Sequence, residues 1–270
     1  MTDFLDEVVA RTQQRVEAQK KQVGLPQLRK RFRDTEPVRP FSKALMRRGG
    51  ISLIAELKQA SPSAGVIRQE SNIEQRIRAY TRGGAAALSI LTEEYYFHGS
   101  PHVLEAARRQ TTLPLLRKDF IIDPYQIDES RSMGADAILL IATLLPDARL
   151  KEFLMLARAA NLEALVEVHD ENDLENALSA EATLIGVNNR NLRTLRVDIS
   201  TAKHLVPLIP KKGKTVVVES GIKDPSELAR FQQWGAHAVL IGETLMRNPD
   251  PEAIVRSFVQ AGRGKVKTRD

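Results

Sequence analysis

Short apolar runs alternate with longer amphipathic segments along most of the chain, from residue 51 onward. Eight of these runs are almost continuously apolar, which is typical of strands covered on both faces. They span residues 51–58, 85–91, 113–120, 136–142, 162–169, 182–189, 215–220 and 237–243. Most are followed by apolar residues at helical spacing, as in IEQRIRAYTRGG after the first run. Repeated strand–helix units predict parallel strands joined by crossover helices.

The number and spacing of these runs indicate a closed barrel. Eight strands that begin 20 to 35 residues apart match a (β/α)₈ or TIM barrel better than an open doubly wound sheet. Glycine stands where helices should end, just before a strand, at Gly84, Gly134 and Gly235. A dinucleotide-binding sheet would need G-x-G-x-x-G after the first strand, where this chain has KQASPSAG. We therefore predict an α/β protein with a single TIM barrel.

The first 48 residues have a different character. They look helical and charged, with breaks at Gly24, Pro26, Pro37 and Pro40. We predict an N-terminal helical extension over 1–48, a barrel catalytic domain over 49–262 and a basic C-terminal tail over 263–270. We expect the extension to cover part of the barrel mouth.

The chain of 270 residues carries a formal net charge of +6, which raises the question of a nucleic-acid partner. Residues 1–50 hold 12 Lys and Arg against 6 Asp and Glu, and residues 261–270 hold 4 against 1, so the central body is slightly acidic. Aromatic residues that could stack on bases are not interleaved with the basic ones. We therefore expect no nucleic-acid partner.

Other classes of protein are excluded by features that the sequence lacks. It has no cysteine, so disulfides and thiolate metal sites are ruled out. Its N-terminus has early acidic residues and none of the apolar character of a secretory signal. The longest apolar stretch, about residues 137–145, is far shorter than the ~20 residues of a membrane span. We expect a cytoplasmic protein that does not bind membranes.

Polar residues interrupt the apolar runs at their carboxyl ends, where barrel enzymes carry their functional groups. Glu56 and Lys58 end the first run and, being two apart, point to the same side of the strand. The later runs end near Lys118, Glu167, Asn188, Arg190 and Glu219. A structural network of ion pairs is the alternative interpretation, because buried charges must be paired. Such residues at five strand ends favour a functional site.

Glycines follow the last two runs. Ser220 and Gly221 come after the seventh run, and Gly242 and Glu243 after the eighth. Loops at these two positions commonly bind phosphate in barrels, because glycine lets backbone N–H groups approach an oxyanion closely. Two ordinary turn glycines are the alternative. The pattern predicts a small phosphorylated substrate.

No metal motif is evident among the histidines. They do not show the spacing of a metal site and we interpret them as surface or core residues: His98, His102, His169, His204 and His237. Ser61 and Ser63 have no histidine nearby in the sequence, which argues against serine as a nucleophile. We expect neither a metal nor another cofactor.

Seven segments now stand out together, in order: IAELKQASPSAG, LTEEYYFHGS, LLRKDFIIDPYQI, LVEVHDENDL, IGVNNRNL, VVVESGI and AVLIGETLM. As a set they resemble the indole-3-glycerol-phosphate synthase family over about residues 51–246, and the helical extension also suits that family. The resemblance implies a cofactor-free carboxy-lyase of tryptophan biosynthesis. Such an enzyme closes 1-(2-carboxyphenylamino)-1-deoxyribulose 5-phosphate to an indole ring, with loss of CO₂ and water.

The resemblance also implies a role for each strand-end residue. Lys118 would be the acid that protonates the substrate ketone, and Glu167 the base for dehydration. Glu56 and Glu219 would hold the lysines and stabilise positive charge on the aryl amine, while Lys58 would contact the phosphate and share the acid's task. The remaining residues would bind the aryl part of the substrate (Ser61, Phe97, Phe120, Asn188, Arg190) or its phosphate (Ser220, Gly221, Gly242, Glu243). We expect the Glu243 side chain to point away from the phosphate.

Three alternatives are weighed against this interpretation. Phosphoribosylanthranilate isomerase has the same fold but uses a cysteine, which this chain lacks. A metal-dependent pentose-phosphate epimerase would need His and Asp ligands where this chain has Glu, Lys and Asn. A non-catalytic barrel would usually have lost its acid or its base, whereas Lys118 and Glu167 are both present. We expect a monomer, with a weak homodimer as the alternative.

Overall fold

The computed structural model describes residues 4–34, 36–46, 50–70, 72–146 and 148–263. Eight parallel strands close into a barrel in the order β1-β10-β9-β8-β7-β6-β5-β4. Their bounds are β1 Ser52–Leu57, β4 Ala87–Leu91, β5 Leu115–Lys118, β6 Ala137–Ile141, β7 Glu163–Val168, β8 Leu184–Asn188, β9 Thr215–Glu219 and β10 Ala238–Ile241. Each lies within one of the eight apolar runs, so the predicted TIM barrel is confirmed.

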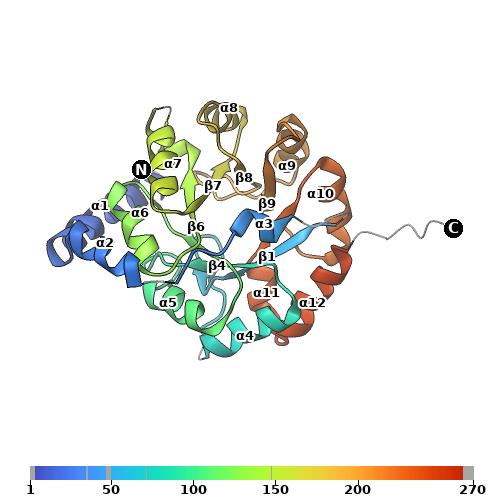
Figure 1. The fold of residues 1–270 in the computed structure, drawn as a ribbon. Coiled ribbons are helices and arrows are strands. Elements are labelled where there is room, and N and C mark those ends of the chain that lie inside the picture. The colour runs from blue at the N-terminus through green and yellow to red at the C-terminus, as the bar shows by residue number, and fades with distance from the viewer. Residues whose placement is uncertain (1–3, 35, 47–49, 71, 147, 264–270) are drawn as a thin grey trace.

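Helices surround the barrel as an outer ring (Figure 1). They are α4 Ile73–Gly83, α5 Pro101–Gln110, α6 Pro124–Ser132, α7 Ala148–Ala159, α8 Glu171–Ser179, α9 Ser200–Leu205, α10 Leu228–Trp234, α11 Glu243–Arg247 and α12 Pro251–Ala261. Short 3-10 turns lie at Ala142–Leu144, Val206–Leu208 and Pro225–Glu227. Three glycines expected at helix ends, Gly84, Gly134 and Gly235, have φ values of 91°, 86° and 115°. Left-handed backbone of this kind favours glycine, because other residues are strained there.

Apolar side chains pack on both faces of the barrel sheet. Alternate residues of the strands, such as Ile54, Leu116 and Leu165, belong to one buried cluster inside the barrel. The other strand residues pack outward against the helices in a second and larger cluster. This division follows from the alternation of side chains along a strand. The barrel is therefore solid below the polar residues at the carboxyl ends of its strands.

The N-terminal extension contacts both ends of the barrel. It forms α1 (Phe4–Gln22), α2 (Leu25–Asp34) and α3 (Phe41–Leu45), and α1 and α2 lie beside α6 (Figure 1). Helix α3 closes the amino end of the barrel, where Ser42 N donates to the Glu163 carboxylate at 3.1 Å. Helix α1 brings Phe4 to the mouth, with its ring centroid 5.0 Å from that of Tyr96. The expected partial cover of the mouth is thus present, together with a plug at the opposite end.

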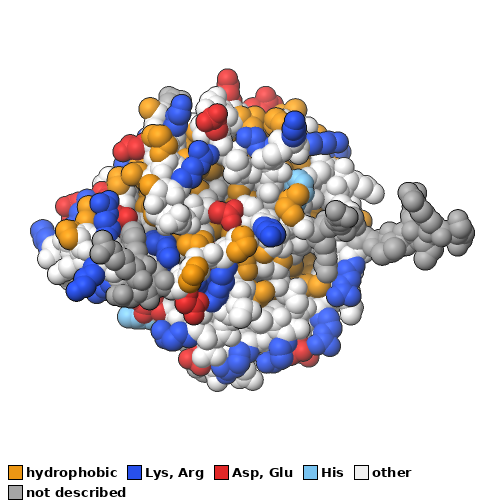
Figure 2. All heavy atoms as spheres, in the orientation of Figure 1, with side chains coloured by type: hydrophobic (Ala, Val, Ile, Leu, Met, Phe, Trp, Pro, Cys, Tyr) orange, Lys and Arg blue, Asp and Glu red, His pale blue; other side chains and the backbone are white. Residues whose placement is uncertain are grey.

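Some features differ from the expectations or add to them. A two-stranded hairpin, β2 (Ala60–Ser61) and β3 (Gly65–Val66), forms in the loop after β1, where no strand is predicted. Most of the predicted basic tail, residues 264–270, lies outside the described residues. On the face shown in Figure 2, basic side chains are interspersed with acidic ones. None of the helices in the described part of the chain is both long and apolar enough to cross a membrane.

Candidate active site

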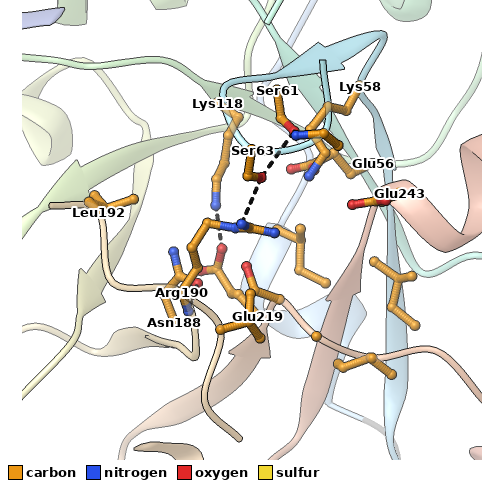
Figure 3. A pocket seen from close by; sticks show the side chains of 18 of the residues that line it. Glu56, Lys58, Ser61, Ser63, Lys118, Asn188, Arg190, Leu192, Glu219 and Glu243 are labelled. Atoms are coloured by element: carbon orange, nitrogen blue, oxygen red, sulfur yellow. Dashed lines mark hydrogen bonds and ion pairs between the residues drawn. The ribbon is translucent and has the colours of Figure 1, made fainter. Parts of the chain in front are cut away.

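One cavity of about 960 Å³ opens at the carboxyl ends of the barrel strands. All fourteen site residues expected from the sequence line it: Glu56, Lys58, Ser61, Phe97, Lys118, Phe120, Glu167, Asn188, Arg190, Glu219, Ser220, Gly221, Gly242 and Glu243. Figure 3 shows several of these side chains, from different strands, converging on the same space. The topology explains this convergence, because the ends of all eight parallel strands meet at one face of the barrel.

Lys118 lies at the centre of the charged groups. Its Nζ is 3.1 Å from Oε2 of Glu167 on β7 and also donates to Oε2 of Glu219 on β9. Burial would lower the pKa of Lys118, but the carboxylates of Glu219 and Glu167 raise it above its usual value. Lys118 therefore carries its proton at neutral pH and can act as an acid.

The two carboxylates bound to Lys118 have different proton affinities. Burial would raise the pKa of Glu167, but Lys118 and the nearby His169 lower it well below its usual range. Burial raises the pKa of Glu219 to about 7, opposed by Lys118 and supported by the charge of Glu167. Environments that make the pKa values of two neighbouring carboxyl groups differ are typical of acid–base sites. Glu167 is therefore ionised at neutral pH, and it holds a proton less tightly than Glu219.

A second lysine–carboxylate pair lies beside the first. Lys58 Nζ is 3.0 Å from Oε1 of Glu56, and Ser89 Oγ lies 3.3 Å from the other oxygen of that carboxylate. Gly242, after β10, leaves room for this pair, because a Cβ there would stand 2.3 Å from Glu56 Oε1 and 3.2 Å from Lys58 Cε. The glycine expected only as a phosphate ligand therefore also accommodates the Glu56 carboxylate.

Gly186, which lies in β8, is a residue that sequence reasoning missed. A Cβ at this position would stand 2.3 Å from Oε1 of Glu219 and 3.2 Å from Leu165 Cδ1. Oε1 of Glu219 is buried and accepts no hydrogen bond from the described residues. The Glu219 carboxylate can therefore occupy this position only because Gly186 has no side chain. A glycine within an apolar strand was the available signal, since it often marks a close approach.

The loop after β8 carries Arg190 across the cavity. Its guanidinium donates to Ser63 Oγ at 2.7 Å and to the Leu195 carbonyl at 2.9 Å, and its backbone N–H donates to Asn188 Oδ1. Ser61, in the hairpin after β1, accepts from Ala64 N at 3.2 Å. Arg190 thereby joins the loops that follow β1 and β8, next to Lys118 and Glu219 (Figure 3).

The chain turns sharply after β9. Ser220 and Gly221 have φ values of 66° and 79°, a conformation that is strained for serine and is common at ligand sites. The side chain of Asn189 holds this turn, since it donates to the Ser220 carbonyl at 3.0 Å and accepts from Ala202 N. The turn borders the cavity beside Gly242, as expected for an anion-binding end.

Aromatic rings form the opposite wall. The ring centroids of Phe97 and Phe120 are 6.2 Å apart, and Phe4 from α1 lies 6.4 Å from Phe120. Glu93 fixes the loop that carries Phe97, because its carboxylate accepts from the backbone N–H of Tyr95, Tyr96 and Phe97. Phe4 was missed because it stands in the charged extension, far from the other wall residues in sequence.

Glu243 lies at the edge of the cavity beside Glu56 (Figure 3). Its Oε1 is 2.9 Å from Nε of Arg247, one turn further along α11. The side chain is thus engaged by its own helix, and its negative charge is balanced by a guanidinium. Its backbone belongs to the first turn of that helix, where N–H groups favour an anion.

Similarity to known proteins shows the family of this chain. A family model for indole-3-glycerol phosphate synthase matches residues 5–258. The chain belongs to the indole-3-glycerol phosphate synthase family. Proteins of that name from Carboxydothermus hydrogenoformans and Neisseria meningitidis are 43% and 45% identical to it. The first alignment covers 92% of this chain and 96% of the relative, and the second covers 94% and 98%.

Solved structures of other enzymes share the fold. Thiamine phosphate pyrophosphorylase from Pyrococcus furiosus has a TM-score of 0.61 at 15% identity, covering 82% of this chain and 97% of that one. 3-Hexulose-6-phosphate synthase from Salmonella typhimurium has a TM-score of 0.63 at 12% identity, covering 78% and 98%. At such low identity they support the barrel alone. Membership of the indole-3-glycerol phosphate synthase family makes the chain a carboxy-lyase of tryptophan biosynthesis.

Proposed function

We propose that the cavity converts 1-(2-carboxyphenylamino)-1-deoxyribulose 5-phosphate to indole-3-glycerol phosphate by acid–base catalysis. The observation that carries this proposal is the position of Lys118, whose ammonium group lies in the cavity between the carboxylates of Glu167 and Glu219. Such a group of side chains can both give and take protons at neutral pH. No metal or cofactor enters the proposed steps.

The first step is ring closure. The aryl carbon that carries the carboxylate forms a bond to the ketone carbon, and the ketone oxygen takes a proton from Lys118. The C–CO₂ bond then breaks, and its electron pair restores the aromatic ring. Positive charge that develops on the aryl amine is stabilised by the carboxylates of Glu56 and Glu219, which line the same cavity.

The second step is dehydration. The new hydroxyl takes a proton from Lys58, which lines the same cavity and regains its proton from solvent, and it leaves as water. The adjacent carbon gives up a proton as the indole double bond forms. We assign the acceptance of that proton to Glu167, because it is ionised and its Oε2 is 3.1 Å from Lys118 Nζ. Transfer from Glu167 to Lys118 would then restore both groups for the next turnover.

Substrate orientation follows from the two ends of the cavity. The turn at Ser220 and Gly221, with Gly242 and Lys58, would bind the phosphate. Phe97 and Phe120 would pack on the aryl ring, with Asn188 and Arg190 on its polar side. Ser61 would meet the carboxylate of the substrate, and the guanidinium of Arg190 also suits such a group.

Single-turnover experiments can separate the two proposed steps. With substrate labelled in its carboxylate, Lys118→Ala should release neither labelled CO₂ nor indole product, yet should still bind the product. Glu167→Gln should release CO₂ but form indole fluorescence at least about 10²-fold more slowly than the parent enzyme. Lys151→Ala, at an exposed site on α7, is the matched lysine control and should behave as the parent. Release of CO₂ at the normal rate by Lys118→Ala would overturn the assignment of the acid.

The proposed site is complete within one chain, because residues of a single chain supply the acid, the base and the anion-binding turn. We therefore propose that the monomer is active. Specific activity should stay constant on dilution of the protein through the nanomolar range. A fall on dilution that an inert protein does not prevent would indicate a required homodimer.

A further inference from the structure

His169 is partly buried behind Glu167 and has no part in the steps above. It follows β7 two residues after Glu167, so both side chains leave the strand on the same side. Its Nε2 is 3.2 Å from Oε1 of Glu167, the oxygen that does not face Lys118. The alignment is too poor for a hydrogen bond, and Nε2 donates to no other described residue. One oxygen of Glu167 thus faces Lys118 and the other faces an imidazole.

Asp173 holds the other side of the imidazole. Its Oδ2 lies 3.2 Å from Nδ1 of His169 and also accepts the backbone N–H of His169 at 3.0 Å. The hydroxyl of Thr143 donates to the same oxygen at 2.8 Å. The backbone N–H of Asp173 donates in turn to Asp170, the N-cap of α8. The carboxylate is fixed by these contacts, and it fixes the ring of His169.

We propose that His169 is a positioning residue for this reaction, a cation held by Asp173 that keeps the carboxylate of Glu167 ionised and directed toward the cavity. This inference rests on the proposed role of Glu167 as the base. Two carboxylates flank the imidazole, an arrangement that favours its protonated form. Burial opposes that form, yet Asp173 and Glu167 together raise the pKa of His169 to about 9.

The reaction itself explains why a second cation is useful. Lys118 stabilises the charge of Glu167 only while it is protonated, and it gives its proton away during ring closure. Without another cation, Glu167 would then bind a proton more tightly and would lose its function as a base for dehydration. His169 gives up no proton in ring closure, so it keeps Glu167 ionised until Glu167 accepts the proton released in dehydration.

Other charged groups also lie near His169. At the N-terminus of α8, Asp170 and Glu171 border the cleft that exposes one edge of the ring. On α9, His204 lies in the same cleft, with Nε2 at 2.6 Å from Glu171. His169 and His204 both line this cleft, but the pair that His204 forms with Glu171 is exposed. His204 is therefore the natural control.

Steady-state pH profiles test the proposal. His169→Gln keeps an amide donor near Glu167 but removes the charge. It should move the acidic limb of the kcat profile upward by about one pH unit or more, because an isolated Glu167 needs a higher pH to ionise. His169→Ala should also lower kcat, with little change in KM, since the ring lies behind Glu167. His204→Gln should give the parent profile. An unchanged acidic limb in a folded His169→Gln enzyme would overturn the proposal.

An NMR titration gives a readout that does not depend on which reaction is catalysed. The imidazole of His169, labelled with ¹⁵N, should be doubly protonated at pH 7.5 and should titrate near pH 9. In Glu167→Gln its titration should move to lower pH, because coupling between two sites is reciprocal. A neutral ring at pH 7.5 would overturn the proposal even if the enzyme is active. An inactive parent enzyme with a coupled His169 would instead refute the proposed function alone.

Discussion

Replacement of Gly186 by alanine should reduce turnover while leaving the fold largely intact. Gly186 lies in β8, and its backbone is not in the left-handed region, so alanine can adopt the same conformation. The added Cβ would stand 2.3 Å from Oε1 of Glu219. The carboxylate must retreat by about 1 Å to reach ordinary contact, and Lys118 is bound to that same carboxylate.

The expected magnitude follows from this displacement. A catalytic group moved by about 1 Å costs on the order of 10²-fold in rate, or about 2.7 kcal/mol in the activation free energy. The new methyl group also lies 3.2 Å from Leu165 Cδ1, a tight contact inside the barrel. Overpacking of this kind lowers the free energy of unfolding by about 1–3 kcal/mol. The protein should remain folded, because barrel domains of this size bury a large core.

Indole fluorescence progress curves at saturating substrate measure the effect on kcat, and urea unfolding measures stability. Gly24→Ala is the matched control, because a Cβ there would meet only Pro26 Cδ at an ordinary 3.6 Å. Its kcat should equal that of the parent enzyme. A folded Gly186→Ala enzyme with kcat within threefold of the parent would refute the claim that the missing side chain positions Glu219.

Three further predictions follow from named contacts. Phe4→Ala removes one ring of the aromatic wall and should raise KM by about 3- to 10-fold with kcat nearly unchanged. Arg117→Leu removes the ion pair that the buried Glu129 makes with Arg117 and leaves Asp119 paired with Arg15 alone. It should lower the free energy of unfolding by about 3–5 kcal/mol in urea; an unchanged midpoint would contradict this. The pKa of His169 is raised from 6.5 to about 9 in the folded state, so its stabilisation is complete below pH 6.5 and is lost as pH rises through 9. The stability difference between parent and His169→Gln should shrink by up to about 3 kcal/mol over that window, and a constant difference would contradict it.

The strands and the polar residues at their ends could be predicted because both appear as local patterns in the sequence. Apolar runs of six to eight residues mark strands covered on both faces, and each predicted run contains one strand of the barrel. Parallel topology then brings the strand ends together, so residues as far apart as Glu56 and Glu243 share one cavity. The convergence of these residues could therefore be predicted without knowledge of any individual contact.

The residues that escaped prediction act through contacts between distant segments. Phe4 reaches the aromatic wall because the start of α1 borders the cavity, and nothing near Phe4 in the sequence indicates this. Gly186 matters through the Glu219 side chain on the neighbouring strand. His169 was interpreted as a surface or core residue, since its neighbours in sequence form no metal motif. Its importance appears only once Asp173 and Glu167 are placed on either side of the ring.

One buried carboxylate at a strand end has a structural role. Asp119 follows Lys118 directly and borders the same cavity, yet its carboxylate is held in ion pairs with Arg15 and Arg117. Burial opposes its ionised form, but Arg15 and Arg117 lower the pKa of Asp119. This carboxylate ties α1 to the strand that carries Lys118. Sequence alone cannot distinguish such a structural pair from a catalytic one, because both place charged residues at strand ends.

An indole fluorescence progress curve tests the central claim most directly. The purified chain would be mixed at catalytic concentration with 1-(2-carboxyphenylamino)-1-deoxyribulose 5-phosphate in the presence of EDTA. We expect a rise in indole fluorescence in the parent enzyme, with one CO₂ released per indole formed, and none in Lys118→Ala. A flat trace from folded parent protein would contradict the assignment of this reaction to the cavity around Lys118.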